Sequence, residues 1–220
     1  EAFAARLDQH LDRLQSELKQ DTYQPQPVRQ VQIPKAGKPG EFRMLGAPTI
    51  YDRVCQQALL NRLELIFEPV FDEAGQLRLS ARAIDEGCHA QSVEGDSKRS
   101  RMDCGRRFKR LFRVCRSQKL LTLIAQQVAD GRVLRLIRAM LKAGSYGKGR
   151  LFPSERGTPQ GSVVSPLLSN ILLTPFDREM RRKGYQLTRF ADDWVVTCQS
   201  ATEARAARDA ALRILSELSV

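Results

Sequence analysis

The sequence predicts an α+β fold in which an antiparallel sheet is flanked by helices. Two pairs of strand-like runs separated by turn residues predict hairpins, one near each end of the 220-residue chain. Elsewhere, apolar residues recur with helical spacing. The second hairpin carries two adjacent acids, Asp192 and Asp193, at its tip. Because neighbouring carboxylates repel each other and gain little packing, a bound divalent cation is the usual reason for such a pair.

The N-terminal part predicts a helix, a hairpin and a second helix. Residues 1–19 place Phe3, Leu7, Leu11, Leu14 and Leu18 on one helical face. Strands are expected at 28–33 and 42–45, on either side of a basic turn rich in Pro and Gly at 34–40. Residues 50–67 follow as an amphipathic helix, with Ile50, Val54, Ala58, Leu63 and Phe67 on its apolar face.

The C-terminal part predicts four helices and the second hairpin. Helices are expected at 119–129 and 132–142, and a Gly/Pro loop at 157 becomes an apolar helix that reaches 173. The strands of the hairpin are 185–189 and 194–198. A capping box at 200–203 begins a final helix that runs through Leu218. Cys55 and Cys198 lie in patterned segments and are expected to be buried thiols.

Charge favours a polyanionic partner. Lys and Arg number 36 against 25 Asp and Glu, a net charge of +11, and such an excess most often serves nucleic acid. Composition alone does not exclude the alternative, a soluble basic protein whose charges are scattered over its surface. A chain of 220 residues can bury one large hydrophobic core or two small ones, so we expect at most two cores.

The cellular compartment of the protein is predicted from features that the sequence lacks. No apolar run is long enough to span a bilayer, so no membrane partner is expected, and no secretory signal opens the chain. The five cysteines form no close pair with metal-site spacing, and an odd number suggests reduced thiols. These features predict a cytoplasmic protein of bacterial type. The chain starts with Glu1 and ends within a helical pattern, so we expect a piece of a longer protein.

Between residues 75 and 118 no helical or strand period persists. Residues 76–118 hold eleven Lys or Arg against five Asp or Glu, and so contribute +6 of the net +11. Three of the five cysteines also lie in this segment. A basic RNA-binding loop is one interpretation, but a loop of this length is uncommon inside a compact domain.

Four blocks of the sequence resemble the reverse transcriptases encoded by group II introns, also called intron maturases. They are Arg189-Phe190-Ala191-Asp192-Asp193-Trp194, the Gly-Thr-Pro-Gln-Gly block with its helix at 157–170, the hairpin blocks 31–35 and 43–48, and residues 52–56. The resemblance covers 1–74 and 119–220. It implies a fingers portion at 1–74 and a palm at 119–220 that is incomplete at its C-terminus, with the thumb absent. Phe190 stands where the family usually has Tyr.

The resemblance also implies an RNA-directed DNA polymerase, a nucleotidyltransferase. In such enzymes a primer 3′-hydroxyl attacks an α-phosphate with the help of two Mg²⁺ ions. Asp192 would be the main metal ligand and Asp193 the supporting one. The alternative for this pair is a solvated Asp-Asp turn.

Further site residues follow from the same resemblance. Lys35 and Arg43 would hold the incoming triphosphate, although an ordinary basic turn explains them too. Gln160 would lie at the nucleotide, while Gly161 and Pro159 would contact the template–primer duplex, or the three would form a plain loop. Phe190 would pack beside the metal site or fill the core. The implied partners are dNTPs, intron RNA, an RNA template and a DNA primer, with a role in intron splicing and mobility.

A third carboxylate, which the resemblance implies within a block like Asp-Leu-Lys-x-x-Phe, is missing. Asp85, Asp96 and Asp103 lack the neighbours of that block. When codons for residues 102–116 are read one nucleotide later, they can spell Trp-Ile-Val-Asp-Ala-Asp-Leu-Lys-Asp-Phe-Phe-Gly-Ser-Val. The same shift lets residues 76–82 spell Ser-Tyr-Gly-Phe-Arg-Pro-Gly, a second family block. We therefore interpret the segment of about 75–118 as anomalous and out of frame, and we expect the palm strand within it to be unformed.

Three functions remain open at this point. The chain is a polymerase fragment, or a catalytically defective remnant that lacks the third metal-binding Asp and retains at most RNA binding, or a basic RNA-binding protein of other ancestry. The ordered series of blocks argues against the third.

Overall fold

The computed structural model describes residues 3–34, 37, 40–73, 102–107, 117–147, 149–153, 161–190 and 193–218. The chain divides into two compact units, each assembled from two separate stretches. The first unit comprises Glu1–Leu65 and Phe112–Leu168, and the second comprises Ile66–Leu111 and Ser169–Val220. Helices and strands occur in both units, as predicted for an α+β fold.

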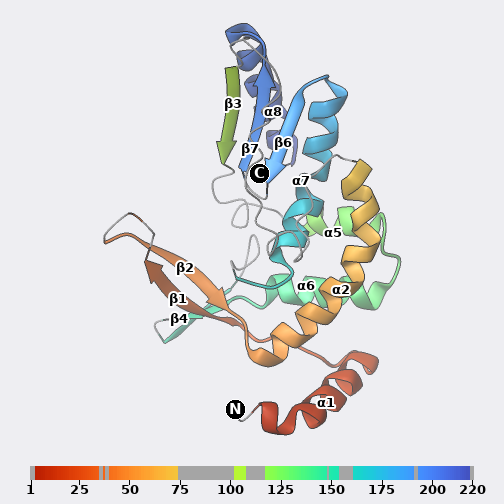
Figure 1. Ribbon diagram of the computed structural model, residues 1–220. Coiled ribbons are helices and arrows are strands. Elements are labelled where there is room, and N and C mark those ends of the chain that lie inside the picture. The colour runs from red at the N-terminus through yellow and green to blue at the C-terminus, as the bar shows by residue number, and fades with distance from the viewer. Residues whose placement is uncertain are drawn as a thin grey trace. The chain divides into compact units, whose positions relative to one another are not determined.

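A four-stranded sheet in the first unit contains the predicted N-terminal hairpin. Its strands lie in the order β2-β1-β4-β5, and the first three are labelled in Figure 1. Strand β1 (Val28–Pro34) and strand β2 (Phe42–Ala47) are antiparallel. Strand β4 (Ser145–Gly147) runs parallel to β1, pairs with β5 (Arg150–Phe152), and is tied to β1 by a 2.8 Å hydrogen bond from Gln30 Nε2 to Ser145 Oγ. The hairpin prediction is confirmed, whereas β4 and β5 had no recognisable pattern.

The described part of the first unit also contains three whole α-helices and the start of α2. A short 3₁₀ turn (Ala4–Arg6) leads into α1 (Leu7–Lys19), and α5 (Ser117–Ala125) packs against α6 (Gly131–Lys142). The predicted break between the last two helices is confirmed, because Asp130 caps α6. Its carboxylate accepts hydrogen bonds from the backbone N–H groups of Arg132 (2.8 Å) and Val133 (3.4 Å). No helix in the described ranges is long and apolar enough to cross a membrane.

Helix α2 (Ile50–Glu73) is longer than predicted, and its buried face differs from the predicted one. Leu63 and Phe67 are buried as expected, but Ile50 is 56% exposed and Ala58 is also exposed. Asp52 and Gln56 are buried instead, together with apolar residues of the same face. The prediction was wrong because it placed polar residues outside, whereas these two have hydrogen-bond partners elsewhere in the chain.

The second unit holds an antiparallel sheet in the order β3-β7-β6 (Figure 1). Its strands are β3 (Met102–Arg107), β6 (Gln186–Phe190) and β7 (Asp193–Cys198). Helix α8 (Ala201–Leu218) packs on β3 and β7. Most of α7 (Ser165–Arg182) also belongs to this unit. Its core includes Phe176, Met180, Trp194, Val196, Ala207 and Ala211.

Strand β3 corrects the expectation that the palm strand within 75–118 is unformed. It is antiparallel to β7, from Met102↔Cys198 to Arg107↔Asp193, so that β7 is the central strand. The ladder between two strands consists of backbone hydrogen bonds, which any non-proline residue makes. A strand therefore forms here without the alternation of apolar residues on which its prediction would have depended.

Candidate functional site

The predicted acidic hairpin forms, and Asp193 lies at its end. Strands β6 and β7 are antiparallel, and the register runs from Gln186↔Thr197 to Phe190↔Asp193. Asp193 is half-buried at the start of β7. Asp192 falls in the two-residue connection 191–192, which lies outside the described residues, and Phe190 is described through its backbone pairing alone.

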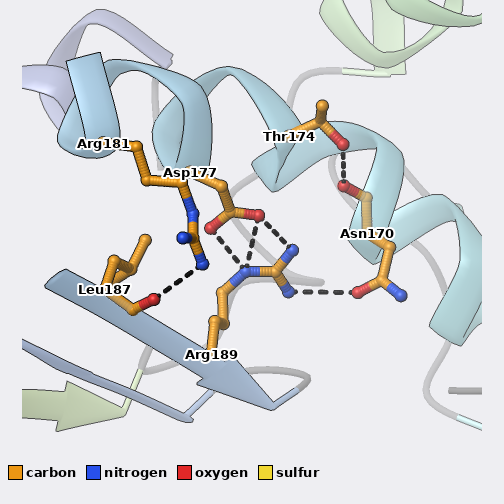
Figure 2. Close-up of polar contacts among 6 residues, drawn as sticks. All are labelled: Asn170, Thr174, Asp177, Arg181, Leu187 and Arg189. Atoms are coloured by element: carbon orange, nitrogen blue, oxygen red, sulfur yellow. Dashed lines mark hydrogen bonds and ion pairs between the residues drawn. The ribbon is translucent and has the colours of Figure 1, made fainter. Parts of the chain in front are cut away.

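A buried ion pair lies one residue back from this end. Arg189 of β6 and Asp177 of α7 are almost fully enclosed, with side chains 3% and 2% exposed. The guanidinium donates from Nε to Asp177 Oδ1 (2.8 Å), from Nη2 to Asp177 Oδ2 (2.6 Å) and from Nη1 to Asn170 Oδ1 (3.0 Å), as Figure 2 shows. Nε also lies 3.1 Å from Asp177 Oδ2. The carboxylate and the amide therefore hold the guanidinium from two sides.

The residue opposite Arg189 is anchored on the same helix. Trp194 pairs with Arg189 across the hairpin and contacts Phe176 edge-on, with ring centroids 5.5 Å apart. A further bond from Arg181 Nη2 to the Leu187 carbonyl oxygen (2.8 Å) ties β6 to the end of α7 (Figure 2). Consecutive residues of α7, Phe176 and Asp177, thus contact both members of the last buried pair before the hairpin tip.

Sequence reasoning missed this network. Arg189 was quoted only as part of the acidic motif, and Asn170 only as the last residue of the block at 157–170. The available signal was helical spacing: Asp177 lies four residues after Leu173 and three before Met180, on the apolar face, where a buried charge requires a partner. Its partner is twelve residues away on a strand, so spacing alone did not identify it.

A two-metal site is not completed by the described residues. No cluster of three or more His, Cys, Asp or Glu that could hold a metal ion occurs in the described part of the chain. In the register of β3 and β7, the residue opposite Asp193 is Arg107, and the acid of β3, Asp103, is opposite Thr197. Four residues along a strand span about 13 Å. The residues of β3 as they stand therefore do not fit a shared magnesium site with Asp193.

A second set of predicted residues lies in the first unit, around Gly161. Gly161 has φ +106°, and a Cβ placed there would overlap the carbonyl oxygen of Gly46 in β2. Ser162 Oγ and the Val163 N–H each donate to Gln56 Oε1 of α2, both at 3.0 Å. The close backbone neighbour of Gly161 in the structure is β2, whereas the predicted contact of Gly161 with the template–primer duplex stays a prediction.

Of the other predicted residues of this set, the structure describes Arg43 alone, and only through its backbone. Lys35, Pro159 and Gln160 lie outside the described residues. Arg43 is placed by its backbone, which pairs with Ile33 across the β1–β2 hairpin. Gln56, which sequence reasoning did not single out, holds the segment after the Gly/Pro loop.

Next to this segment, buried polar groups fix the start of α2. The Tyr23 hydroxyl donates to Asp52 Oδ1 (2.5 Å) and the Thr49 hydroxyl donates to Asp52 Oδ2 (2.7 Å). Burial and the bond to Asp52 raise the pKa of Tyr23. Burial raises the pKa of the neighbouring Cys55 thiol to about 11. Cys55 and Cys198 are both buried free thiols, as predicted.

Comparison with known proteins places these features in a family. The family described as "Reverse transcriptase (RNA-dependent DNA polymerase)" matches residues 33–220. Protein YkfC of Escherichia coli (strain K12) is 31% identical over 193 residues, which are 86% of this chain and 50% of YkfC. The group II intron-encoded protein LtrA of Lactococcus lactis subsp. cremoris is 32% identical over 173 residues, 78% of this chain and 28% of LtrA. The chain thus spans half or less of these curated relatives.

Solved structures share the fold at low sequence identity. Telomerase from Candida albicans, in complex with a fragment of telomeric RNA, superposes with a TM-score of 0.64 at 13% identity, covering 89% of this chain and 40% of that one. Telomerase from Candida tropicalis gives 0.55 at the same identity, covering 84% and 46%. The predicted resemblance to group II intron reverse transcriptases is confirmed, and the chain belongs to the reverse transcriptase (RNA-dependent DNA polymerase) family.

Proposed function

We propose that the chain is the fingers and palm portion of a group II intron-encoded reverse transcriptase, an RNA-directed DNA polymerase. The observation that carries this proposal is the β6–β7 hairpin, which places Asp193 at the end of an antiparallel sheet in a chain of this family. Its partners would be intron RNA, an RNA template, a DNA primer and dNTPs. In this proposal the protein takes part in the splicing and the mobility of the intron.

Each predicted site residue has a place in this proposal. Asp192 and Asp193 are the acids that would hold Mg²⁺, which when bound compensates the charge that develops on the transferring phosphoryl group. Lys35 and Arg43 would bind the triphosphate, and Gln160 and Phe190 would contact the nucleotide. Gly161 and Pro159 would face the template–primer duplex. In support, Gly161 lies against Gly46 of β2, the strand that also carries Arg43.

The register of β3 favours a second candidate function, a catalytically defective remnant that retains at most RNA binding. Position 107, opposite Asp193, holds Arg in place of a carboxylate. In the shifted reading of codons 102–109, position 107 becomes the Asp that precedes Leu-Lys. Reading frame and strand register thus point independently to the same position. We propose on this basis that residues 75–118, between fingers at 1–74 and palm at 119–220, are translated out of frame.

Primer extension on an RNA template with Mg²⁺ tests both candidates. The chain as it stands should give little or no synthesis, because Arg107, a basic residue, stands at the position proposed for the third carboxylate. A matched protein with 76–118 in the shifted frame should synthesise DNA, and Asp192→Ala in that protein should abolish the synthesis. Robust extension by the unaltered chain, abolished by Asp192→Ala, would refute the candidate function of a defective remnant and support that of an active polymerase.

A further inference from the structure

We propose that one face of helix α6 binds the phosphate backbone of double-helical RNA. We call it the basic face of α6, and its side chains are those of Arg132, Arg135, Arg138 and Lys142. The choice of RNA as the polyanion rests on the proposed function, in which intron RNA is a partner. None of the predicted site residues lies on this helix.

The first step is the arrangement of charge on α6. At 3.6 residues per turn, the four cations occupy about a third of the circumference of the helix and extend over about 15 Å of its length. All four are exposed. The opposite face carries Ile137, Met140 and Leu141, which are buried. Because α6 itself contains no acidic residue, the charges of the basic face are all of one sign.

The second step is a comparison with another helix of the chain. An ordinary solvated helix face mixes charges of both signs, which pair with one another. Helix α8 is of this kind, because its three arginines are balanced by three acids. In α6, Arg135 alone of the four cations has a carboxylate partner in the described part of the chain. The uncompensated charge of the other three favours a polyanionic partner.

The third step is the kind of polyanion that the basic face fits. A helix that binds a membrane surface buries its apolar face in the lipid, but the apolar face of α6 is buried within the protein. Unpaired bases are bound by stacking on aromatic side chains, and α6 has no aromatic residue. Double-helical RNA is recognised through its shape, its phosphates and its 2′-hydroxyl groups. A row of cations without aromatic residues therefore suits the double helix best.

The fourth step is the pairing of Asp21 with the basic face. Asp21 Oδ2 accepts hydrogen bonds from Arg135 Nε (3.0 Å) and Nη2 (2.5 Å). Both side chains are exposed, 59% for Arg135 and 47% for Asp21, and a pair so exposed contributes little to stability. Asp21 therefore competes with phosphate for Arg135 and weakens the binding of RNA.

The backbone of Asp21 supports this role. Asp21 directly follows the C-cap of α1, a position at which glycine is usual. Its φ is +61°, and among the described residues it is the one non-glycine residue with a positive φ. A carboxylate thus occupies a position where glycine would fit with less strain, and its contact is Arg135.

Fluorescence anisotropy of a labelled RNA hairpin tests the proposal on the full chain. The hairpin has about 16 base pairs, the span that one duplex-binding domain covers, and a blunt end that offers no template to copy. The dissociation constant is measured between about 50 and 200 mM salt, because each phosphate contact adds to its salt dependence. Thermal melts recorded in parallel show whether each variant is folded.

The informative variant is Arg132→Gln with Arg138→Gln. It should weaken binding about 10–100-fold near 0.1 M salt and lower the slope of log K against log salt by about 2, one for each lost cation. The matched control, Arg205→Gln with Arg213→Gln in α8, removes the same charge from a helix of mixed sign and should bind nearly as the wild type does. Since all four side chains are exposed, both variants should melt close to the wild type.

Asp21→Asn should act in the opposite direction. It frees Arg135 for phosphate, and asparagine tolerates the left-handed backbone conformation. Binding of the hairpin should tighten about 3–10-fold, and the salt slope should rise by up to about 1. If the double variant of α6 does not fold, Lys142→Gln carries the test of weakened binding, with a slope lower by about 1.

The basic face is overturned as an RNA site if the α6 and α8 variants weaken binding equally, or if Asp21→Asn leaves the affinity unchanged. Tighter binding to a single-stranded RNA of the same length, to a DNA hairpin or to vesicles containing phosphatidylserine would overturn the choice of double-helical RNA. None of these outcomes depends on DNA synthesis. Failure of the basic face is therefore distinguishable from failure of the proposed polymerase, which primer extension reports.

Discussion

Gly161 occupies a backbone conformation that suits glycine, and the space beside it is closed. Its φ of +106° is strained for any residue with a Cβ, and the carbonyl oxygen of Gly46 stands where that atom would go. Gly149 offers a matched comparison within the same unit, since it has φ +74° with open space around it. Comparing substitutions at the two positions therefore separates the energetic cost of backbone strain from that of close approach.

Gly161→Ala should destabilise the chain more than Gly149→Ala does. Both substitutions carry the cost of a left-handed conformation, about 1–2 kcal/mol. Gly161→Ala adds overpacking against β2, about 1–3 kcal/mol. Thermal melts followed by circular dichroism should place the midpoint of Gly161→Ala lower by about 2–4 °C per kcal/mol of this difference. Equal midpoints for the two variants would show that β2 does not close the space beside Gly161.

Cys55 makes stability fall at alkaline pH. Burial raises its folded-state pKa to about 11, from the ordinary thiol value of 9.0. A group whose folded pKa is raised contributes stability that is complete below the unfolded pKa and is lost as pH rises through the folded pKa. The window for the thiol is therefore about pH 9 to 11. Near pH 10.5 the loss from this group should be about 2 kcal/mol.

Cys55→Ala should flatten this part of the pH dependence. Between pH 8 and 10.5 the melting temperature of the wild type should drop by about 4–8 °C more than that of the variant. The variant starts from a lower midpoint at pH 8 because it leaves a small cavity, so the comparison is the change with pH for each protein. The same drop in both proteins would argue against a buried, protonated thiol at this position.

Single residues also show which features of the fold could be predicted from the sequence and which could not. The two buried thiols were predicted, since Cys is among the residues most often buried. Asp52, Gln56 and Arg189 were not recognised as buried. Each is stabilised inside the protein by groups far away in sequence: Tyr23 for Asp52, Ser162 for Gln56 and Asp177 for Arg189. No periodicity encodes such partners.

Among the elements, α8 begins at the capping box that the sequence predicted. Ser200 Oγ accepts from the Glu203 N–H at 3.1 Å, and Glu203 Oε2 accepts from the Gln199 N–H at 2.6 Å. The glutamate thus reaches one residue further back than in the usual box, in which it binds the N-cap residue. The helix packs on β3 and β7, so its start helps to hold the central strand.

Ser200→Ala should cost about 1 kcal/mol of stability, because the Glu203 N–H loses its acceptor. Ser200→Asp keeps an acceptor and adds a favourable charge at the helix N-terminus, and should melt near the wild type. For a chain of this length the alanine variant should melt about 2–4 °C lower. If alanine and aspartate melted alike, the cap would be contributing nothing measurable.

The predictability of the elements depended on their length and regularity. Both hairpins and the helices with apolar stripes were predicted, with ends that differ by a few residues. Strands β4 and β5 have three residues each, too few for alternation to show. Strand β3 formed without a pattern, because pairing with β7 depends on the backbone.

At the scale of the whole molecule, the proposed change of frame makes a claim about the gene. If residues 75–118 are out of frame, the DNA of codons 74–119 should encode the Tyr-Gly-Phe-Arg-Pro and Asp-Leu-Lys blocks when read one nucleotide later. Sequencing this stretch decides the matter. Codons whose shifted reading lacks both blocks would refute the proposal, and Arg107 would then be a genuine feature of the palm.

The central place of β1 in its sheet has a consequence for synthesis on the ribosome. Its partner on one side, β2, follows within a few residues, but its partner on the other side, β4, emerges more than a hundred residues later. Until then the nascent chain presents an open strand edge, which is prone to pair with another molecule. Such a long-range parallel pairing also slows folding. Nascent chains stalled before β4 should therefore depend on chaperones, whereas completed chains should need them less.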